Sequence, residues 1–161
     1  MTATAATLHV PGPDEWRRWR TIRLRSLEQD PDAFGSTLER ELGHTEQDWR
    51  SRLEYGCSVI ADLDGRDVGL GAGFSDEPGR LMVVAMWTDP AFRGRGVGRA
   101  VLEHVVGVAG ERNLGAHMWV VEGNSAQHLY ESAGFVPDGQ REPVREGFPL
   151  MMRHLVLSRG L

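Results

Sequence analysis

The chain of 161 residues is long enough for one domain with a full hydrophobic core and too short for two domains that each have such a core. We therefore expect a single domain over residues 1–161. Hydrophobic residues make up 40% of the chain and charged residues 25%, as in an ordinary globular protein. The 18 basic residues are all arginine, and 23 acidic residues leave a net charge of -5, which argues against a nucleic-acid-binding face because such a face is basic.

Cysteine usage and hydropathy point to the cytoplasm. The only cysteine, Cys57, has no partner for an internal disulfide and no metal-ligand spacing around it, so we expect a reducing compartment and no metal site. The start, MTATAATLHV, lacks the basic and apolar regions of a signal peptide. No apolar run approaches the roughly 20 residues of a membrane helix. We expect residues 1–6 to be flexible.

The N-terminal third predicts a short strand and two helices. Residues 7–10 form the strand, and Asp14 is placed to cap a helix over residues 15–28. A second helix is expected at residues 45–54. Arg20 and Arg23 fall within the apolar stripe of the first helix, where they either pair with a carboxylate or line a substrate cleft.

The middle of the chain predicts three strands. Residues 57–75 read as two strands joined by a tight turn at Asp64-Gly65. Three alternating glycines, Gly69, Gly71 and Gly73, stand in the second strand and indicate a bulge or a close backbone contact. Residues 80–90 are almost all apolar, which predicts a strand buried on both faces.

The remaining elements alternate between helix and strand. Valines at positions 97, 101, 105 and 108 indicate a helix that ends before Gly115. A strand at 117–121, a helix at 125–134, a strand from 134 and a last strand at 148–157 follow. This order predicts an α/β fold with a partly antiparallel sheet.

The stretch AFRGRGVGRAV, residues 91–101, concentrates glycine and arginine between the apolar strand and the next helix. The first amide groups of a helix lack internal partners, the helix dipole is positive at that end, and glycine lets an anion approach the backbone. The stretch is therefore either a phosphate-binding loop or a turn with solvated arginines. Gly98-Arg99-Ala100 excludes the Walker P-loop, and the glycine spacing excludes the dinucleotide fingerprint.

This loop resembles the pyrophosphate loop of the GCN5-related N-acetyltransferases, whose pattern Arg93, Gly96 and Gly98 match. A second segment resembles the family's downstream motif, in which an Asn precedes a helix with Leu-Tyr and a Gly-Phe follows. Its residues here are Asn124, Ala126, Leu129, Tyr130, Gly134 and Phe135. The order of elements over residues 7–157 also agrees with the family.

The resemblance implies a GNAT-like acyl-CoA N-acyltransferase fold, with a mixed, mostly antiparallel central sheet and helices on both faces. It also implies an enzyme that transfers acetyl from acetyl-CoA directly to a primary amine. The apolar strand would bulge and splay from strand 117–121, and its N–H near Trp87 or Thr88 would stabilise the oxyanion. The residues implied to bind the cofactor are Met86, Trp87, Thr88, Arg93, Gly94, Arg95, Gly96, Val97, Gly98, Arg99 and Asn124.

By the same resemblance, Tyr130 is the general acid that protonates the departing thiolate, since a phenol stays protonated at neutral pH. On residue pattern alone, Tyr130 would be a core residue of its helix. The base is Glu39 or Glu41, with Glu41 preferred, or a water chain. Relatives that acetylate protein N-termini carry a strand glutamate where this chain has Met118 and Trp119.

The acceptor is predicted to be a small amine, and the acidic chain favours a cationic one by steering. Aromatic candidates for its walls are Trp16, Trp19, Phe34, Trp49 and Phe148. Two alternatives stay open: acetylation of a protein lysine or N-terminus, and a non-catalytic acyl-CoA sensor. A homodimer is compatible with the sequence but is not predicted by any one feature.

Overall fold

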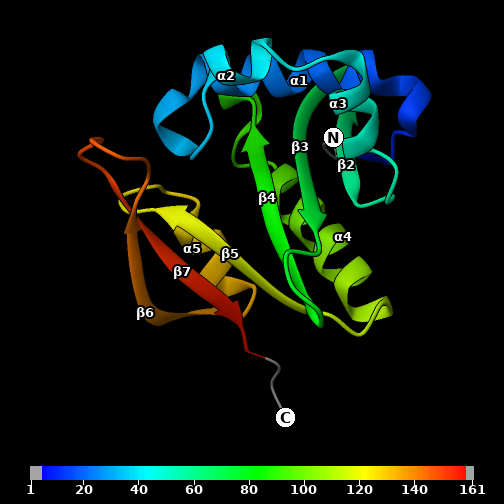
Figure 1. Cartoon of the computed structure of the whole chain (residues 1–161). Coiled ribbons are helices and arrows are strands. Elements are labelled where there is room, and N and C mark those ends of the chain that lie inside the picture. The colour runs from blue at the N-terminus through cyan, green and yellow to red at the C-terminus, as the bar shows by residue number, and fades with distance from the viewer. Residues whose placement is uncertain (1–4, 159–161) are drawn as a thin grey trace.

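The computed structural model describes residues 5–158, which fold around a seven-stranded sheet (Figure 1). Its strands are β1 (Thr7–His9), β2 (Ser58–Leu63), β3 (Arg66–Phe74), β4 (Arg80–Thr88), β5 (Gly115–Val121), β6 (Phe135–Pro143) and β7 (Met151–Leu157). Their spatial order is β1-β2-β3-β4-β5-β7-β6, and every neighbouring pair except β4 and β5 is antiparallel. The predicted mixed, mostly antiparallel sheet is therefore confirmed.

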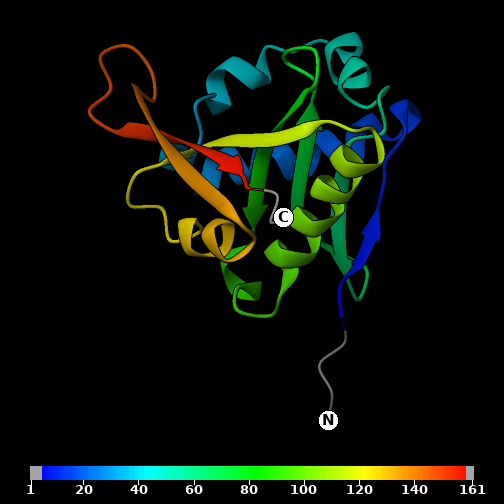
Figure 2. The same ribbon diagram turned by 90° about the horizontal axis from the view of Figure 1, so that it is seen from below.

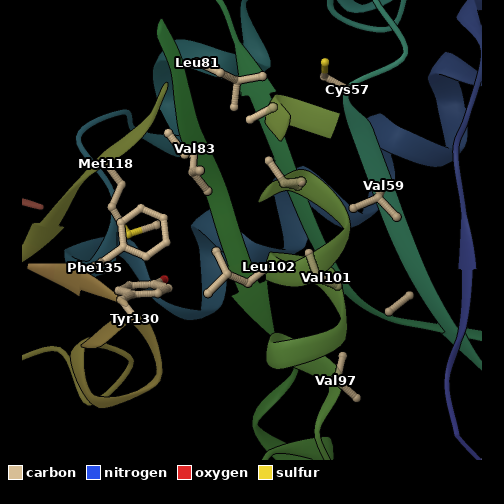
Figure 3. Packing of buried hydrophobic residues seen from close by; sticks show 14 of the residues in the cluster. Cys57, Val59, Leu81, Val83, Val97, Val101, Leu102, Met118, Tyr130 and Phe135 are labelled. Atoms are coloured by element: carbon tan, nitrogen blue, oxygen red, sulfur yellow. The ribbon is translucent and has the colours of Figure 1, made fainter. Parts of the chain in front are cut away.

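Helices cover both faces of this sheet (Figure 2). The α-helices are α1 (Trp16–Gln29), α2 (Leu38–Leu42), α3 (Glu46–Arg52), α4 (Val97–Glu111) and α5 (Gln127–Ser132), with short 3-10 turns at Pro13–Glu15, Pro31–Ala33 and Pro90–Phe92. Helices α1 and α3 pack on one face around Trp19, Trp49 and Leu70. Helices α4 and α5 pack on the other, where Val101 and Phe135 belong to a separate core cluster (Figure 3).

The three alternating glycines of β3 let helix α4 and side chains of β4 pack closely against this strand, as their pattern predicted. A Cβ at Gly69 would lie 2.8 Å from Cγ1 of Val97, and one at Gly71 would lie 2.5 Å from Cγ1 of Val101. Both distances are far below van der Waals contact, so only glycine permits this approach. The same close packing sets the position of the first turn of α4 relative to the end of β4.

The start of α1 differs from the prediction. Asp14 does not cap the helix, because a 3-10 turn precedes it and α1 begins at Trp16. The carboxylate of Glu15 closes that turn, accepting the Gly12 N–H at 3.2 Å and contacting Nε2 of His9 at 2.6 Å. Proline at the first position of the turn favours this tight start over a capped α-helix.

Three other elements also depart from the predictions. Helix α2 was not predicted, since five residues are too few for a helical period to show in sequence. The last strand begins at Met151 instead of residue 148. Strand β4 is not buried on both faces: Leu81, Val83 and Trp87 are buried, whereas the residues between them are partly exposed, because a cleft opens along this strand.

Two further expectations concern the start of the chain and helices that could cross a membrane. The flexible segment expected at residues 1–6 falls mostly on residues 1–4, which lie outside the described residues, while Ala6 packs against the core cluster. Among residues 5–158, no helix has both the length and the hydropathy needed to cross a membrane. Helix α4, at 15 residues, is shorter than the roughly 20 that a bilayer requires.

Candidate active site

Strands β4 and β5 begin as a parallel pair and then separate (Figure 1). Their register runs from Arg80 opposite Gly115 to Val83 opposite Met118 and stops there. Directly beyond, the pairing of β4 with β3 shifts, and Ala85 adopts a φ of 61°. A non-glycine residue in the left-handed region marks a β-bulge, which turns the strand away from its neighbour. The backbone of β4 after Val83 thus faces a gap on its β5 side.

A cavity of about 840 Å³ occupies this gap at the carboxyl ends of the two strands. Its walls include ten of the eleven residues that the resemblance implied for the cofactor: Met86, Trp87, Thr88, Arg93, Gly94, Gly96, Val97, Gly98, Arg99 and Asn124. Arg95 does not line the cavity, and its guanidinium lies 5.4 Å from the centre of the Phe92 ring. The cavity is within the size range of sites for small organic ligands.

The loop at one end of this cavity has the geometry of an anion site. Gly94 and Gly96 have φ angles of 81° and 82°, which glycine adopts without strain. Gly96 is the N-cap of the 15-residue helix α4 and has no side chain to cap it, so the N–H groups of the first turn are left to an incoming ligand. The exposed guanidinium of Arg99, which donates to the Ser132 hydroxyl at 2.9 Å, adds positive charge beside them.

Arg93 of this loop is held by β4 and by Asp30, the residue that follows α1. Its Nε donates to the Thr88 carbonyl at 3.0 Å, and its Nη2 donates to Oδ2 of Asp30 at 3.0 Å. The same carboxylate oxygen accepts the indole N–H of Trp87 at 2.6 Å. Asp30 therefore connects the loop to the strand that lines the gap. Sequence reasoning missed Asp30, since it lies 57 residues from Trp87 and no local pattern marks the pairing.

Tyr130 lies on α5 at the inner end of the cavity, with 5% of its surface exposed. Figure 3 shows its ring next to Phe135 and Met118 at the edge of the core cluster. Burial raises the pKa of its phenol well above the ordinary value of 10, so the hydroxyl stays protonated at neutral pH. Tyr130 is thus packed in the core, as its residue pattern predicted, and it also borders the cavity.

A second cavity of about 310 Å³ adjoins the first. The two share five lining residues, which are Ala33, Met86, Val121, Asn124 and Tyr130. The smaller cavity lies between β4, β5 and the loop after α1, and its other walls include Arg23, Phe34, Ser36, Met82, Trp119 and Met152. Tyr130 thus stands where two compartments meet. Of the five aromatic residues suggested for an acceptor wall, Phe34 lines this cavity.

Glu41 lies in α2 and lines neither cavity. Its carboxylate is 1% exposed and accepts Nε and Nη2 of Arg23 at 3.0 and 2.8 Å. Nη1 of Arg52 adds a third hydrogen bond at 3.0 Å. Burial alone would raise the pKa of Glu41, but the hydrogen bond and charge of Arg23 outweigh it and lower the pKa to about 2. Such a carboxylate is a weak base, and Glu39 is exposed on α2.

Sequence reasoning also missed a buried chain of polar groups behind Trp119. His117 and His154 are each 2% exposed, and Nδ1 of the first lies 2.8 Å from Nε2 of the second. Asp76 contacts the outer nitrogen of His117 at 3.0 Å, and Asp138 contacts that of His154 at 2.6 Å. The His154 ring packs against Trp119, with 4.8 Å between the ring centres. The four residues lie far apart in the sequence, so no local motif predicts these contacts.

Comparison with known proteins identifies the family and the fold of this chain. A family model described as the acetyltransferase (GNAT) family matches residues 16–135. A mycothiol acetyltransferase from Propionibacterium freudenreichii subsp. shermanii is 36% identical over 112 residues, which are 65% of this chain and 35% of that protein. The match thus spans about a third of the length of that relative.

Solved structures show the same fold. An acetyltransferase of the GNAT family from Streptococcus pneumoniae superimposes with a TM-score of 0.77 and 20% identity, covering 94% of this chain and 98% of the other. A putative acetyltransferase from Salmonella typhimurium, solved with acetyl-CoA, gives a TM-score of 0.74 and 15% identity, covering 98% and 97%.

Proposed function

Because this chain belongs to the acetyltransferase (GNAT) family, we propose that it transfers the acetyl group of acetyl-CoA directly to a primary amine of a small-molecule acceptor. One observation carries the proposal: Tyr130 lines both cavities. The larger cavity also contains the uncapped N-terminus of α4, which suits an anion. A single compartment would serve a binding protein, whereas two compartments that meet at a protonated hydroxyl suit a transfer between two molecules. We assign the whole chain, residues 1–161, to one catalytic domain.

The larger cavity is the proposed site of acetyl-CoA, and its chemistry fits that molecule. The uncapped N–H groups of Val97, Gly98 and Arg99 would bind the pyrophosphate. The unpaired β5-facing side of β4, beyond Val83, would hydrogen-bond the amides of the pantetheine arm. This arrangement would direct the thioester toward the junction of the two cavities.

The chemical step follows from this placement. The neutral amine of the acceptor attacks the thioester carbonyl carbon, and a β4 N–H near Trp87 or Thr88 stabilises the oxyanion. The carbon–sulfur bond then breaks, and Tyr130 donates its proton to the departing thiolate. Water takes the proton that the acceptor ammonium loses before the attack, because Glu41 lies outside both cavities and its pKa is about 2. The nitrogen of the intermediate loses a second proton as the amide forms, and this proton restores the phenol of Tyr130 through water.

A small-molecule acceptor is favoured over a protein by the size of the smaller cavity, about 310 Å³, and by the absence of a glutamate at Met118 and Trp119. The mycothiol acetyltransferase, by its name, also acts on a small molecule. The cytoplasmic location stays a prediction, and the buried thiol of Cys57 suits a reducing compartment. A homodimer is compatible with the sequence and is not part of the proposal.

Two measurements test the proposal in order. Thermal unfolding with CoA and with acetyl-CoA should show a rise in melting temperature for each, because a ligand that binds only the folded state stabilises it. Release of free thiol from acetyl-CoA over a panel of amines should then detect turnover. Binding without turnover on small amines or peptides would support a sensor instead, and no binding of either ligand would overturn the proposal.

A further inference from the structure

The smaller cavity contains one buried hydrogen-bond donor that the protein leaves unused. Arg23 is 7% exposed, and its Cζ lies 4.8 Å from the centre of the Phe34 ring. Two of its nitrogens donate to Glu41, whereas Nη1 has no hydrogen-bond partner among the described residues. A buried donor without a partner costs about 1–3 kcal/mol, so proteins leave few of them. Arg23 lines the cavity, and less than 1 Å² of Nη1 is exposed, so a molecule in the cavity reaches this donor once the side chains that cover it move aside.

The charge of this cavity is opposite in sign to that of the chain. Glu41 carries one negative charge, and Arg23 and Arg52 both pair with it, which leaves one positive charge over the three groups. No other residue that lines the smaller cavity is charged. Although the chain has a net charge of -5, the wall beside Arg23 therefore favours an anionic group and disfavours a polycation.

The remaining walls are mostly apolar. The smaller cavity, which Arg23 and Tyr130 line, is also lined by Met82, Val84, Trp119 and Met152. Such walls bind hydrocarbon groups and exclude water, which strengthens a hydrogen bond from the guanidinium.

We propose that the acceptor is an amino acid with an apolar side chain, whose carboxylate accepts hydrogen bonds from Nη1 of Arg23 while its amine points toward Tyr130. The proposal rests on the acetyl transfer proposed above and names the acceptor class for that same site. Arg23 is a specificity residue that holds the acceptor; it takes no part in proton transfer. The expectation of a cationic acceptor from net charge alone is replaced by the local charge at this wall.

The experiment compares amino acids with the same molecules lacking the carboxylate. Leucine, methionine and phenylalanine are paired with 3-methylbutylamine, 3-(methylthio)propylamine and 2-phenylethylamine, and thiol release from acetyl-CoA is measured at a pH where each amine is partly neutral. A hydrogen bond to a charged group contributes about 1.5–3 kcal/mol, so kcat/KM for at least one amino acid should exceed that of its amine by about 10-fold to 100-fold. Equal or better turnover of the three amines would overturn the inference and leave the acetyl transfer intact.

A variant then assigns the preference to Arg23. Arg23→Lys keeps the charge beside Glu41 but lacks the forked guanidinium, so the preference for the amino acid should fall about 10-fold while CoA binding stays unchanged. Arg17→Gln, on the exposed side of the same helix, is the control and should keep the full preference. Equilibrium binding of N-acetylleucine in the presence of CoA gives a readout without turnover, and should weaken about 10-fold in Arg23→Lys. An unchanged affinity in a folded variant would refute the role of Arg23.

CoA binding without turnover of any amino acid or amine would overturn the acceptor class, whereas no CoA binding would overturn the acetyl transfer itself. The two failures are therefore distinguishable. Should Arg23→Lys fail to fold, the comparison of amino acids with amines on the unaltered chain still decides the acceptor class.

Discussion

Replacement of Glu41 by Gln should destabilise the protein strongly, because the buried carboxylate of Glu41 is the ion-pair partner of two guanidiniums. Its carboxylate accepts three hydrogen bonds from Arg23 and Arg52, and its side chain is 1% exposed. Removal of one partner from a buried ion pair leaves an uncompensated charge and costs about 3–5 kcal/mol. We expect a loss of that size in the free energy of unfolding at pH 7.

The pH dependence gives an independent measure of the same contact. The pKa of Glu41 is lowered from 4.5 to about 2 in the folded chain, so its contribution is complete above pH 4.5 and is lost as the pH falls toward 2. Two-state linkage with these values gives a loss of about 1 kcal/mol between pH 5 and pH 3.5, and about 2 kcal/mol by pH 3. Glu41→Gln cannot take up this proton and should lack that part of the acid destabilisation.

Urea unfolding, followed by tryptophan fluorescence at pH 7, 5 and 3.5, measures both effects. Glu39→Gln is the matched control, since Glu39 is exposed on the same helix and should change stability by less than about 0.5 kcal/mol. If Glu41→Gln unfolds with the stability and pH slope of the unaltered chain but loses turnover, Glu41 is the base and its structural role is refuted.

Three further substitutions test the site and its support. Tyr130→Phe should lower kcat about 100-fold with little change in CoA affinity, and an unchanged kcat would remove Tyr130 from the mechanism. Gly96→Ala should weaken CoA binding and destabilise the loop by about 1 kcal/mol. Gly139→Ala, also at positive φ but at a residue that lines neither cavity, should lower the stability without weakening CoA binding. Gly71→Ala should lower the free energy of unfolding, measured in urea, by about 1–3 kcal/mol. The control Gly107→Ala, with open space at its Cβ, should stabilise α4, and equal effects of the two would show that close packing does not explain Gly71.

Local patterns in the sequence determined much of the fold and pointed to most of the residues that line the larger cavity. The helical spacing of the valines in α4, the glycine pattern of β3 and the order of all elements other than α2 were each confirmed, because period and turn chemistry are properties of neighbouring residues. The family was also predictable, since Arg93, Gly96 and Gly98 follow a strand and open a helix within one continuous segment.

The smaller cavity, which is the proposed acceptor site, was decided only by tertiary structure. The pairing of Arg23 with Glu41 joins residues 18 positions apart, and the sequence allowed Arg23 either an ion pair or a cleft, whereas the fold places it in both. The hydrogen bond from Trp87 to Asp30 and the contact of His117 with His154 likewise span 57 and 37 positions. Net charge favoured a cationic acceptor, but the field at a buried wall depends on which few charges lie within several ångströms of it, and only the packed chain sets those distances.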